Sequence, residues 1–229
     1  RDIPPLLEEP RDAVRVVSVA ELAVADPSDI VAIAEAAPEP PSACAVEHAD
    51  ALLAADTAAT EVRLAAGRAV AIVVDFGRDV SGYPRLDLDG PAGATIDVSY
   101  CERLRDDGRA QVQRANVITS QNVHRYILRD GEQTWEKFER AGFRYLQLTV
   151  GPAPDRPDAP VRIRRANVNF STYPVGSRGS FSCSDPDLTR IWNAGAYTLQ
   201  LCMQDGFEDC PSREQRQWAG DAYVESMVN

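Results

Sequence analysis

The stretch "RAVAIVVDFGRDVSGYPRLDLDGPAGATIDVSYCERL", residues 68–104, decides the fold. Its first part, 68–76, is rich in β-branched and aromatic residues and suits a buried strand. Residues 83–90 and 94–104 alternate apolar and polar side chains, which is the period-two pattern of a strand. The "DGPAG" cluster between those two segments is typical of a turn. We therefore expect three consecutive strands here.

Four more short segments continue the strand pattern toward the C-terminus. They are residues 122–128, 134–139, 143–150 and 161–173. Seven or so short strands at this spacing predict an antiparallel, jelly-roll-like β-sandwich. We expect this domain to span residues 61–178.

The first 60 residues have a different composition, rich in Ala, Pro and Glu. The segment "RDIPPLLEEP" (1–10) cannot be a regular helix, because its prolines remove backbone donors and favour extended geometry. We expect residues 1–60 to form a linker or N-terminal arm, extended or with partial strands, that lies on a neighbouring domain.

Helical spacing begins in "FSCSDPDLTRIWNAGAYTLQLCMQDG", residues 181–206. Ser184 or Asp185 suits the N-cap, Pro186 suits the first turn, and Gly206 suits the C-terminal cap. Apolar residues recur every three or four positions between these signals. The sequence thus predicts an amphipathic helix of about five turns.

A second helix is predicted to begin in "WAGDAYVESMVN", residues 218–229, and to be cut short. We therefore interpret residues 179–229 as the start of a truncated α-helical domain. The first helix would then expose an apolar stripe, which invites association. We expect this chain to aggregate, to form a homodimer through that helix, or to fold the helix onto the sandwich.

Composition excludes several classes of protein. The 44% of hydrophobic residues argues against global disorder, and the net charge of -11 disfavours nucleic acid as a partner. Five cysteines without a CxxC pair and only two histidines favour neither a disulfide framework nor a metal site, and we expect no cofactor. No apolar run reaches the ~18 residues needed to span a bilayer, so we expect no membrane partner. The compartment stays open.

The segment "DCPSREQRQWAGD", residues 209–221, concentrates carboxylates beside two arginines and a tryptophan. Glycoside hydrolysis needs one carboxylic acid to protonate the leaving oxygen and a second carboxylate to activate water. Asp209 and Glu214 could converge on a sugar-sized pocket, and Trp218 offers a flat face for a sugar ring. The alternative is a solvated loop whose Arg–carboxylate pairs cap two helices, since such pairs are common and weak.

Four segments in the same order resemble bacterial α-L-rhamnosidases of glycoside hydrolase family 78. Residues 209–221 match the signature Asp-x-Pro-x-Arg-Glu/Asp followed by Trp-x-Gly-Asp. Residues 73–104 resemble the family's Asp-Phe-Gly…Ser-Gly strand pair, and "FERAGFRYLQL" (138–148) resembles its Phe-x-x-x-Gly-Phe-Arg-Tyr segment. Residues 181–195 are similar to the family's entry into its catalytic domain.

The resemblance implies a β-sandwich that leads into an (α/α)6 barrel and the inverting hydrolysis of terminal α-L-rhamnosides. Glu214 would be the general acid. Asp209 and Asp221 would bind the sugar hydroxyls and tune the acid, and Arg213 and Trp218 would shape the pocket. The implied partners are a rhamnosyl glycoside substrate and the remainder of the catalytic barrel.

Two departures from the family pattern bear on function. "QRQW" (215–218) replaces the Arg-Leu-Gly-Trp of many rhamnosidases, which keeps open a six-hairpin glycosidase for another sugar. The family's general base, a Glu, is implied to lie beyond Asn229, so we expect this chain alone to be an inactive fragment. A third interpretation is a non-catalytic carbohydrate-binding or structural sandwich. Its candidate aromatic residues are Tyr83, Tyr100, Tyr126, Trp135 and Tyr145.

Overall fold

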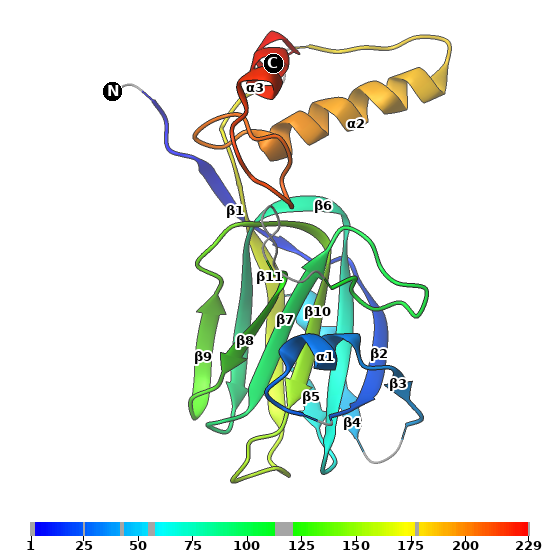
Figure 1. The fold of residues 1–229 in the computed structure, drawn as a ribbon, viewed down its shortest axis with the longest axis vertical. Helices are drawn as coiled ribbons and strands as arrows, with labels where there is room; N and C mark the ends of the chain where they lie inside the picture. The colour runs from blue at the N-terminus through cyan, green and yellow to red at the C-terminus, as the bar shows by residue number, and fades with distance from the viewer. Residues whose placement is uncertain are drawn as a thin grey trace.

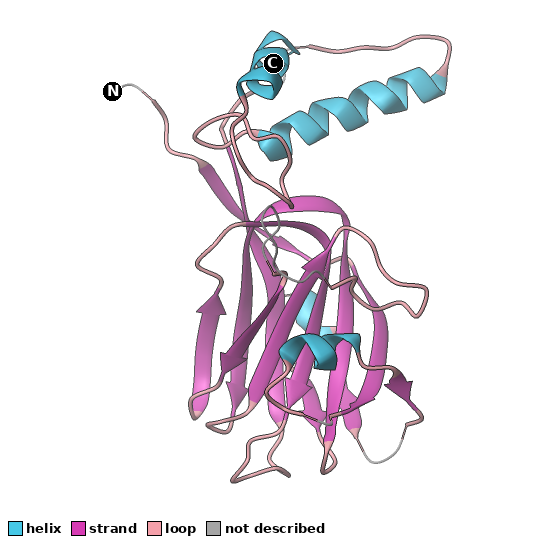
Figure 2. Ribbon diagram, viewed as in Figure 1, coloured by secondary structure: helices cyan, strands magenta, loops and turns pink. Residues whose placement is uncertain are grey.

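A computed structural model describes residues 3–24, 26–41, 44–54, 58–112, 121–176 and 179–228. An antiparallel β-sandwich forms the body of the molecule, and helices α2 (Pro186–Cys202) and α3 (Ala219–Val228) lie at one end of it (Figures 1 and 2). The predicted order of a sandwich followed by helices is confirmed.

The described residues form eleven strands in one continuous antiparallel network. These are β1 (Leu7–Asp12), β2 (Arg15–Ala23), β3 (Pro38–Glu39), β4 (Ala45–Glu47), β5 (Thr60–Arg63), β6 (Arg68–Gly90), β7 (Thr95–Cys101), β8 (Val123–Ile127), β9 (Gly131–Glu136), β10 (Ala141–Gly151) and β11 (Val161–Thr172). Helix α1 (Ile30–Glu35) and a 3₁₀ turn (Ala51–Leu53) lie between the early strands.

Strand β6 belongs to both layers, and it merges the two strands expected at 68–76 and 83–90. Its first half pairs with β2 and β10, and its second half pairs with β11 and β9. Gly82 lies where the strand passes from one layer to the other. A Cβ on Gly82 would lie 2.2 Å from the carbonyl oxygen of Asn169, so only glycine fits this close backbone approach.

The pairing of β6 gives each layer its strand order. One layer runs β3-β2-β6-β10-β7-β8, and the other runs β4-β5-β11-β6-β9. Strand β1 pairs with β11 beside β5. The region 1–60, predicted as a linker or arm with partial strands, thus contributes strands to both layers. The domain boundary near residue 60 stays a prediction.

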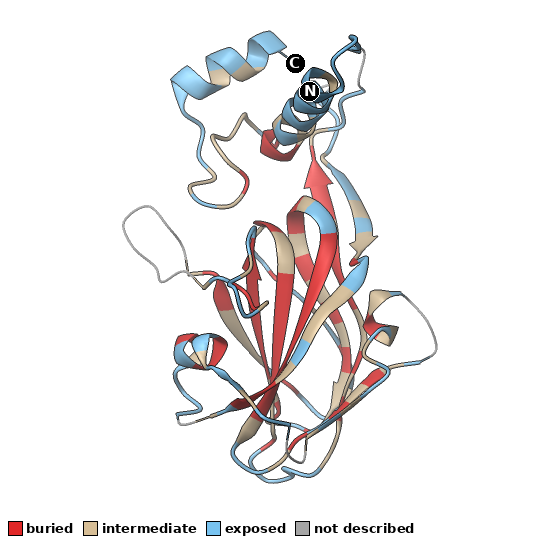
Figure 3. Cartoon of the chain, turned by 90° about the vertical axis from the view of Figure 1, so that its right-hand side faces the viewer, coloured by how far each residue is buried: buried red, intermediate tan, exposed pale blue. Residues whose placement is uncertain are grey.

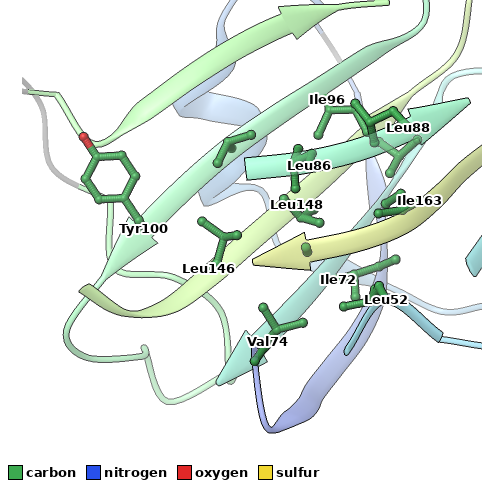
Figure 4. Close-up of a cluster of buried hydrophobic side chains, with 14 of the residues drawn as sticks. Leu52, Ile72, Val74, Leu86, Leu88, Ile96, Tyr100, Leu146, Leu148 and Ile163 are labelled. Atoms are coloured by element: carbon green, nitrogen blue, oxygen red, sulfur yellow. The ribbon is translucent and has the colours of Figure 1, made fainter. Parts of the chain in front are cut away.

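The core lies between the layers. Figure 4 shows Leu86, Leu88, Ile96, Leu146 and Leu148 converging from β6, β7 and β10. Each of these side chains is at most 1% exposed. Burial of one such side chain contributes about 2 kcal/mol to folding. Figure 3 shows how burial is distributed along the chain: the strands are mostly buried, whereas α2 and α3 are mostly exposed.

Helix α2 begins as the sequence predicts. The Asp185 carboxylate accepts a hydrogen bond from the backbone N–H of Asp187 at 2.9 Å, and Pro186 occupies the first turn. The helix ends at Cys202, so the C-terminal cap predicted at Gly206 is wrong. The reason is tertiary: the Thr172 hydroxyl at the end of β11 donates to the Gln200 carbonyl at 2.7 Å, and the chain then turns back on itself.

The expected apolar stripe of α2 is exposed in its first turns. Leu188, Ile191 and Trp192 are 49%, 67% and 36% exposed. The last turn, with Leu201 and Cys202, is buried, and one turn earlier the half-buried Tyr197 packs against the core of the sandwich and donates to the Asp79 carbonyl at 2.5 Å. No helix in the described ranges is long and apolar enough to cross a membrane.

Asp75 ties three strands together near the helical end of the sandwich. Its buried carboxylate accepts hydrogen bonds from Arg15 on β2, from Arg144 on β10 and from the backbone N–H of Gly77. Burial alone would raise the pKa of Asp75, but the bonds from Arg144, Gly77 and Arg15 outweigh it and lower the pKa to about 2. The carboxylate is therefore an ionised strand-to-strand link at neutral pH.

Replacement of Asp75 with Asn is expected to lower the free energy of unfolding by about 2 kcal/mol at pH 7. Because the folded pKa lies below the unfolded value, this contribution is present above pH ~4 and is lost as the pH falls toward 2. Urea unfolding between pH 7 and 2 measures it, with the exposed Asp155→Asn variant as control. An Asp75→Asn protein whose stability falls as steeply with acid as the wild type would contradict this assignment.

Candidate functional site

The carboxylate-rich segment forms a loop that connects α2 to α3. Hydrogen bonds between Asp209 and Arg216 close the loop from both sides: the N–H of Asp209 donates to the Arg216 carbonyl, and the N–H of Arg216 donates to the Asp209 carboxylate, each at 3.0 Å. The thiol of Cys210 donates to the other carboxylate oxygen at 3.2 Å. This pairing holds the two ends of the 209–216 segment together.

Glu214 lies within this closed loop, and the structure brings it together with Arg213 and Trp218. Arg213 donates to one carboxyl oxygen at 2.5 Å, and the indole N–H of Trp218 donates to the other at 3.2 Å. The Glu214 side chain is only 15% exposed, whereas Arg213 is 53% exposed. Glu214 is thus a shielded carboxyl whose two oxygens are oriented by neighbours from its own loop.

The two amides of the "QRQW" segment hold the loop itself. The Gln215 side chain donates to the Pro211 carbonyl at 2.6 Å, and Gln215 adopts a left-handed backbone with φ of 53°. Gln217 packs against Gly206, where a Cβ would lie 2.9 Å from its side-chain oxygen. These amides therefore have a structural role in this loop.

The acidic residues on either side of the loop differ in their pKa values. Burial raises the pKa of Asp209, but hydrogen bonds from Arg216 and Cys210 outweigh burial and hold it below its ordinary value. Asp221 lies in the first turn of α3. Burial, followed by the negative charges of Asp221, Asp209 and Glu208, raises the pKa of Glu225 one turn further along that helix. Asp209 is therefore an ionised hydrogen-bond acceptor. The crowding of negative charge contributes to the raised pKa of Glu225.

The loop rests directly on the end of the sandwich. A Cβ on Gly142 of β10 would lie 2.2 Å from the carbonyl oxygen of Pro211 and 2.8 Å from the N of Ser212. The Ser212 hydroxyl donates to Glu102, beyond β7, at 2.9 Å. In Figure 1 the same loop descends from the helices to the top of the strands.

A buried ion pair makes a second connection between loop and sandwich. Arg140, just before β10, donates to Glu208 and, at 2.5 Å, to the Ser81 hydroxyl on β6. The side chains of Arg140 and Glu208 are 11% and 15% exposed. The sequence analysis assigns no role in the site to Arg140, Glu208, Gly142 or Glu225. Nothing in the sequence pairs Arg140 with Glu208, 68 positions away.

A cavity of about 300 Å³ lies between the sandwich and the loop, lined on the loop side by Ser212, Arg213 and Gln215. Most of the charged side chains that line the cavity form ion pairs or hydrogen bonds. Lys137 binds Glu139 at 3.1 Å, and the other contacts are those of Ser212, Arg213 and Arg140 given above. Within the ranges that the structure describes, no group of three or more His, Cys, Asp or Glu side chains is placed to hold a metal ion.

The aromatic residues proposed for a carbohydrate-binding face mostly pack inward. Tyr100 is 9% exposed and stacks on His124 with ring centroids 5.8 Å apart. Tyr126 and Trp135 contact each other at 5.9 Å and pack against the core. These three side chains therefore form no open platform for a sugar ring.

Two family profiles match consecutive parts of the chain. The bacterial alpha-L-rhamnosidase concanavalin-like domain matches residues 66–168. The bacterial alpha-L-rhamnosidase 6 hairpin glycosidase domain matches residues 177–229. The sandwich and the helices thus correspond to two consecutive domains of the same family.

Individual relatives agree with these profiles. An alpha-L-rhamnosidase of Formosa agariphila is 32% identical over 159 residues, which is 66% of this chain and 16% of the relative. The crystal structure of a GH78 family rhamnosidase of Bacillus sp. GL1 is 34% identical with a TM-score of 0.69, covering 78% of this chain and 18% of that one. A rhamnosidase from Klebsiella oxytoca, at 23% identity and a TM-score of 0.67, shares the fold over 99% of this chain and 41% of its own.

The chain has a β-sandwich, two helices that follow it and a carboxylate-bearing loop between those helices. These features place it among the six-hairpin glycosidases with a preceding β-sandwich. It belongs to the bacterial α-L-rhamnosidases of glycoside hydrolase family 78. The chain spans about a sixth of the length of the curated relatives that it matches, 16% and 17% for the two from Formosa agariphila.

Proposed function

We propose that residues 203–221 form the sugar-binding floor of an α-L-rhamnosidase that hydrolyses terminal α-L-rhamnosides with inversion. The observation that carries the proposal is the shielded Glu214 carboxyl, set between Arg213 and Trp218 in a loop that closes on itself. The rhamnosidase names of the relatives described above supply the substrate class.

In this proposal Glu214 is the general acid that protonates the glycosidic oxygen. Asp209, whose pKa is lowered, stays ionised and accepts hydrogen bonds from sugar hydroxyls. Asp221 lies at the start of α3 and adds a second acceptor. Arg213 and Trp218 hold the acid and shape the pocket around the sugar ring. We assign no general base among residues 1–229.

The experiment is a comparison of matched aryl glycosides with the full-length product of the gene that encodes this chain. We expect measurable kcat/KM on p-nitrophenyl α-L-rhamnopyranoside and at least ~10²-fold less on the α-D-glucopyranoside, whose hydroxyls present a different pattern to the acceptors Asp209 and Asp221. A folded full-length protein that prefers the glucoside would instead support a six-hairpin glycosidase for another sugar.

In the sequence, the amides Gln215 and Gln217 keep that other-sugar alternative open. Because both contact the loop, their presence is accounted for without a different substrate. The binding-module alternative needs an exposed aromatic platform, and the inward packing of Tyr100, Tyr126 and Trp135 disfavours it.

We further propose that residues 1–229 by themselves form a homodimer through the exposed face of α2. Its apolar residues Leu188, Ile191 and Trp192 are each more than a third exposed, and exposed apolar patches favour association. Sedimentation velocity of residues 1–229 and of the Ile191→Ser variant tests this. A wild-type chain that stays monomeric at high concentration would contradict it.

A further inference from the structure

We propose that Arg140 of the β-sandwich is a positioning residue for the site, acting on the loop through its ion pair with Glu208. The inference rests on the proposed function of that loop. It assigns a role in the reaction to the sandwich, which carries none of the sugar-contacting residues proposed above.

The ion pair between Arg140 and Glu208 is buried and is held by a further hydrogen bond. Arg140 uses two different nitrogens, one toward the Ser81 hydroxyl at 2.5 Å and one toward Glu208. Ser81 is fully buried on β6, and Arg140 and Glu208 are nearly so. A guanidinium can form such a two-sided bridge because its donors are fixed in one plane. The bridge therefore fixes the position of Glu208 relative to two strands.

The position of Glu208 in turn restricts the position of the loop at the site. It directly precedes Asp209, the residue that closes the loop with Arg216, and its own N–H donates to the Cys202 carbonyl at 2.9 Å. Burial raises the pKa of Glu208, and the charge of Arg140 opposes that effect. Loss of Arg140 would leave a buried carboxyl without its cation, which is strongly unfavourable. Glu208 would then move toward water and displace Asp209.

The close approach of Gly142 to Pro211 occurs at the same surface of the sandwich and also restricts the position of the loop. Arg140 and Gly142 are two residues apart on one strand entry, and they contact the loop at positions 208 and 211. The geometry thus assigns two adjacent anchor points on the sandwich to the segment that contains Asp209 and precedes Glu214.

The test compares Arg140→Met, Arg140→Lys and the control Arg156→Met in the full-length gene product. Arg156 pairs with Asp130 in a solvent-exposed ion pair. We expect kcat on an aryl α-L-rhamnoside to fall at least ~10-fold in Arg140→Met, since small displacements of reacting groups reduce rates strongly. Arg140→Lys should recover part of the loss, because lysine restores the charge but not the two-sided bridge. Arg156→Met should match the wild type.

A second readout does not depend on activity. Hydrogen exchange at the amides of Asp209 and Arg216 should be at least ~10-fold faster in Arg140→Met, whereas exchange in β7 and β10 stays as in the wild type. A merely structural role would lower the thermal midpoint and leave kcat per folded molecule and loop exchange unchanged, and that result would overturn the inference.

The two readouts separate this inference from the proposed function. If the wild-type protein does not act on rhamnosides, the proposed function fails, and loop exchange in Arg140→Met still decides whether Arg140 positions the loop. If the wild type is active and Arg140→Met retains both its kcat and its slow loop exchange, the positioning role is wrong.

Discussion

Replacement of Glu214 with Gln is expected to lower kcat/KM for an alkyl α-L-rhamnoside by about 10²–10⁴-fold, the usual contribution of general acid catalysis. The amide keeps the size of the side chain but cannot deliver a proton to the leaving oxygen. It also has one oxygen for the two donors, Arg213 and Trp218, that contact the carboxyl. Steady-state kinetics on the full-length gene product measures the effect.

The leaving group separates an acid from other roles of Glu214. A p-nitrophenolate leaves without being protonated, so the loss on p-nitrophenyl α-L-rhamnopyranoside should be much smaller than the loss on the alkyl glycoside. The control is Glu136→Gln, which changes an exposed carboxyl on β9. Equal losses on both substrates would indicate a binding role for Glu214, and no loss on either would remove it from the site.

Replacement of Gly142 with Ala is expected to lower kcat/KM on rhamnosides by about 10²-fold, because ångström-scale misplacement of reacting groups has effects of that size. The added Cβ would lie 2.2 Å and 2.4 Å from two backbone atoms of Pro211. Backbone cannot rotate out of the way as a side chain can, so the loop that carries Asp209 and Glu214 must shift. Overpacking of this kind also costs about 1–3 kcal/mol of stability.

Gly151→Ala is the matched variant, because Gly151 lies at the opposite end of β10 from the loop and its Cβ would lie 2.4 Å from the Thr95 hydroxyl oxygen. It should lose stability to a similar degree, measured by thermal unfolding, while the folded fraction keeps its kcat/KM. Gly176→Ala, with no atom within 4 Å of the added Cβ, should behave as the wild type. If Gly142→Ala retains the wild-type kcat/KM per folded molecule, the loop does not depend on this contact.

Local signals in the sequence predicted much of the fold. The alternation in 94–104 and the run at 161–173 appear as β7 and β11, and Asp185 and Pro186 begin α2 as expected. The errors arise where tertiary contacts override local signals. Gly82 allows two expected strands to continue as one, because its bare backbone can meet Asn169. Thr172 on β11 engages the last turn of α2, which ends before Gly206.

The candidate site also contains residues that the sequence predicted and residues that only the structure revealed. Asp209, Arg213, Glu214, Trp218 and Asp221 were identified from one short segment, and the structure brings Arg213, Glu214 and Trp218 into contact. Their assigned roles remain predictions. The anchors Arg140 and Gly142 could not be found from spacing, because each meets the loop only after the sandwich has formed. A single sequence does not reveal such pairs, which are far apart along the chain.

The most direct test of the central claim is a crystal structure of the full-length Glu214→Gln protein with a terminal α-L-rhamnoside bound. The account predicts sugar hydroxyls within hydrogen-bond distance of Asp209 and Asp221, the ring near Trp218, and the glycosidic oxygen facing position 214. A rhamnoside bound on the strands of the sandwich, or elsewhere away from residues 203–221, would contradict the account.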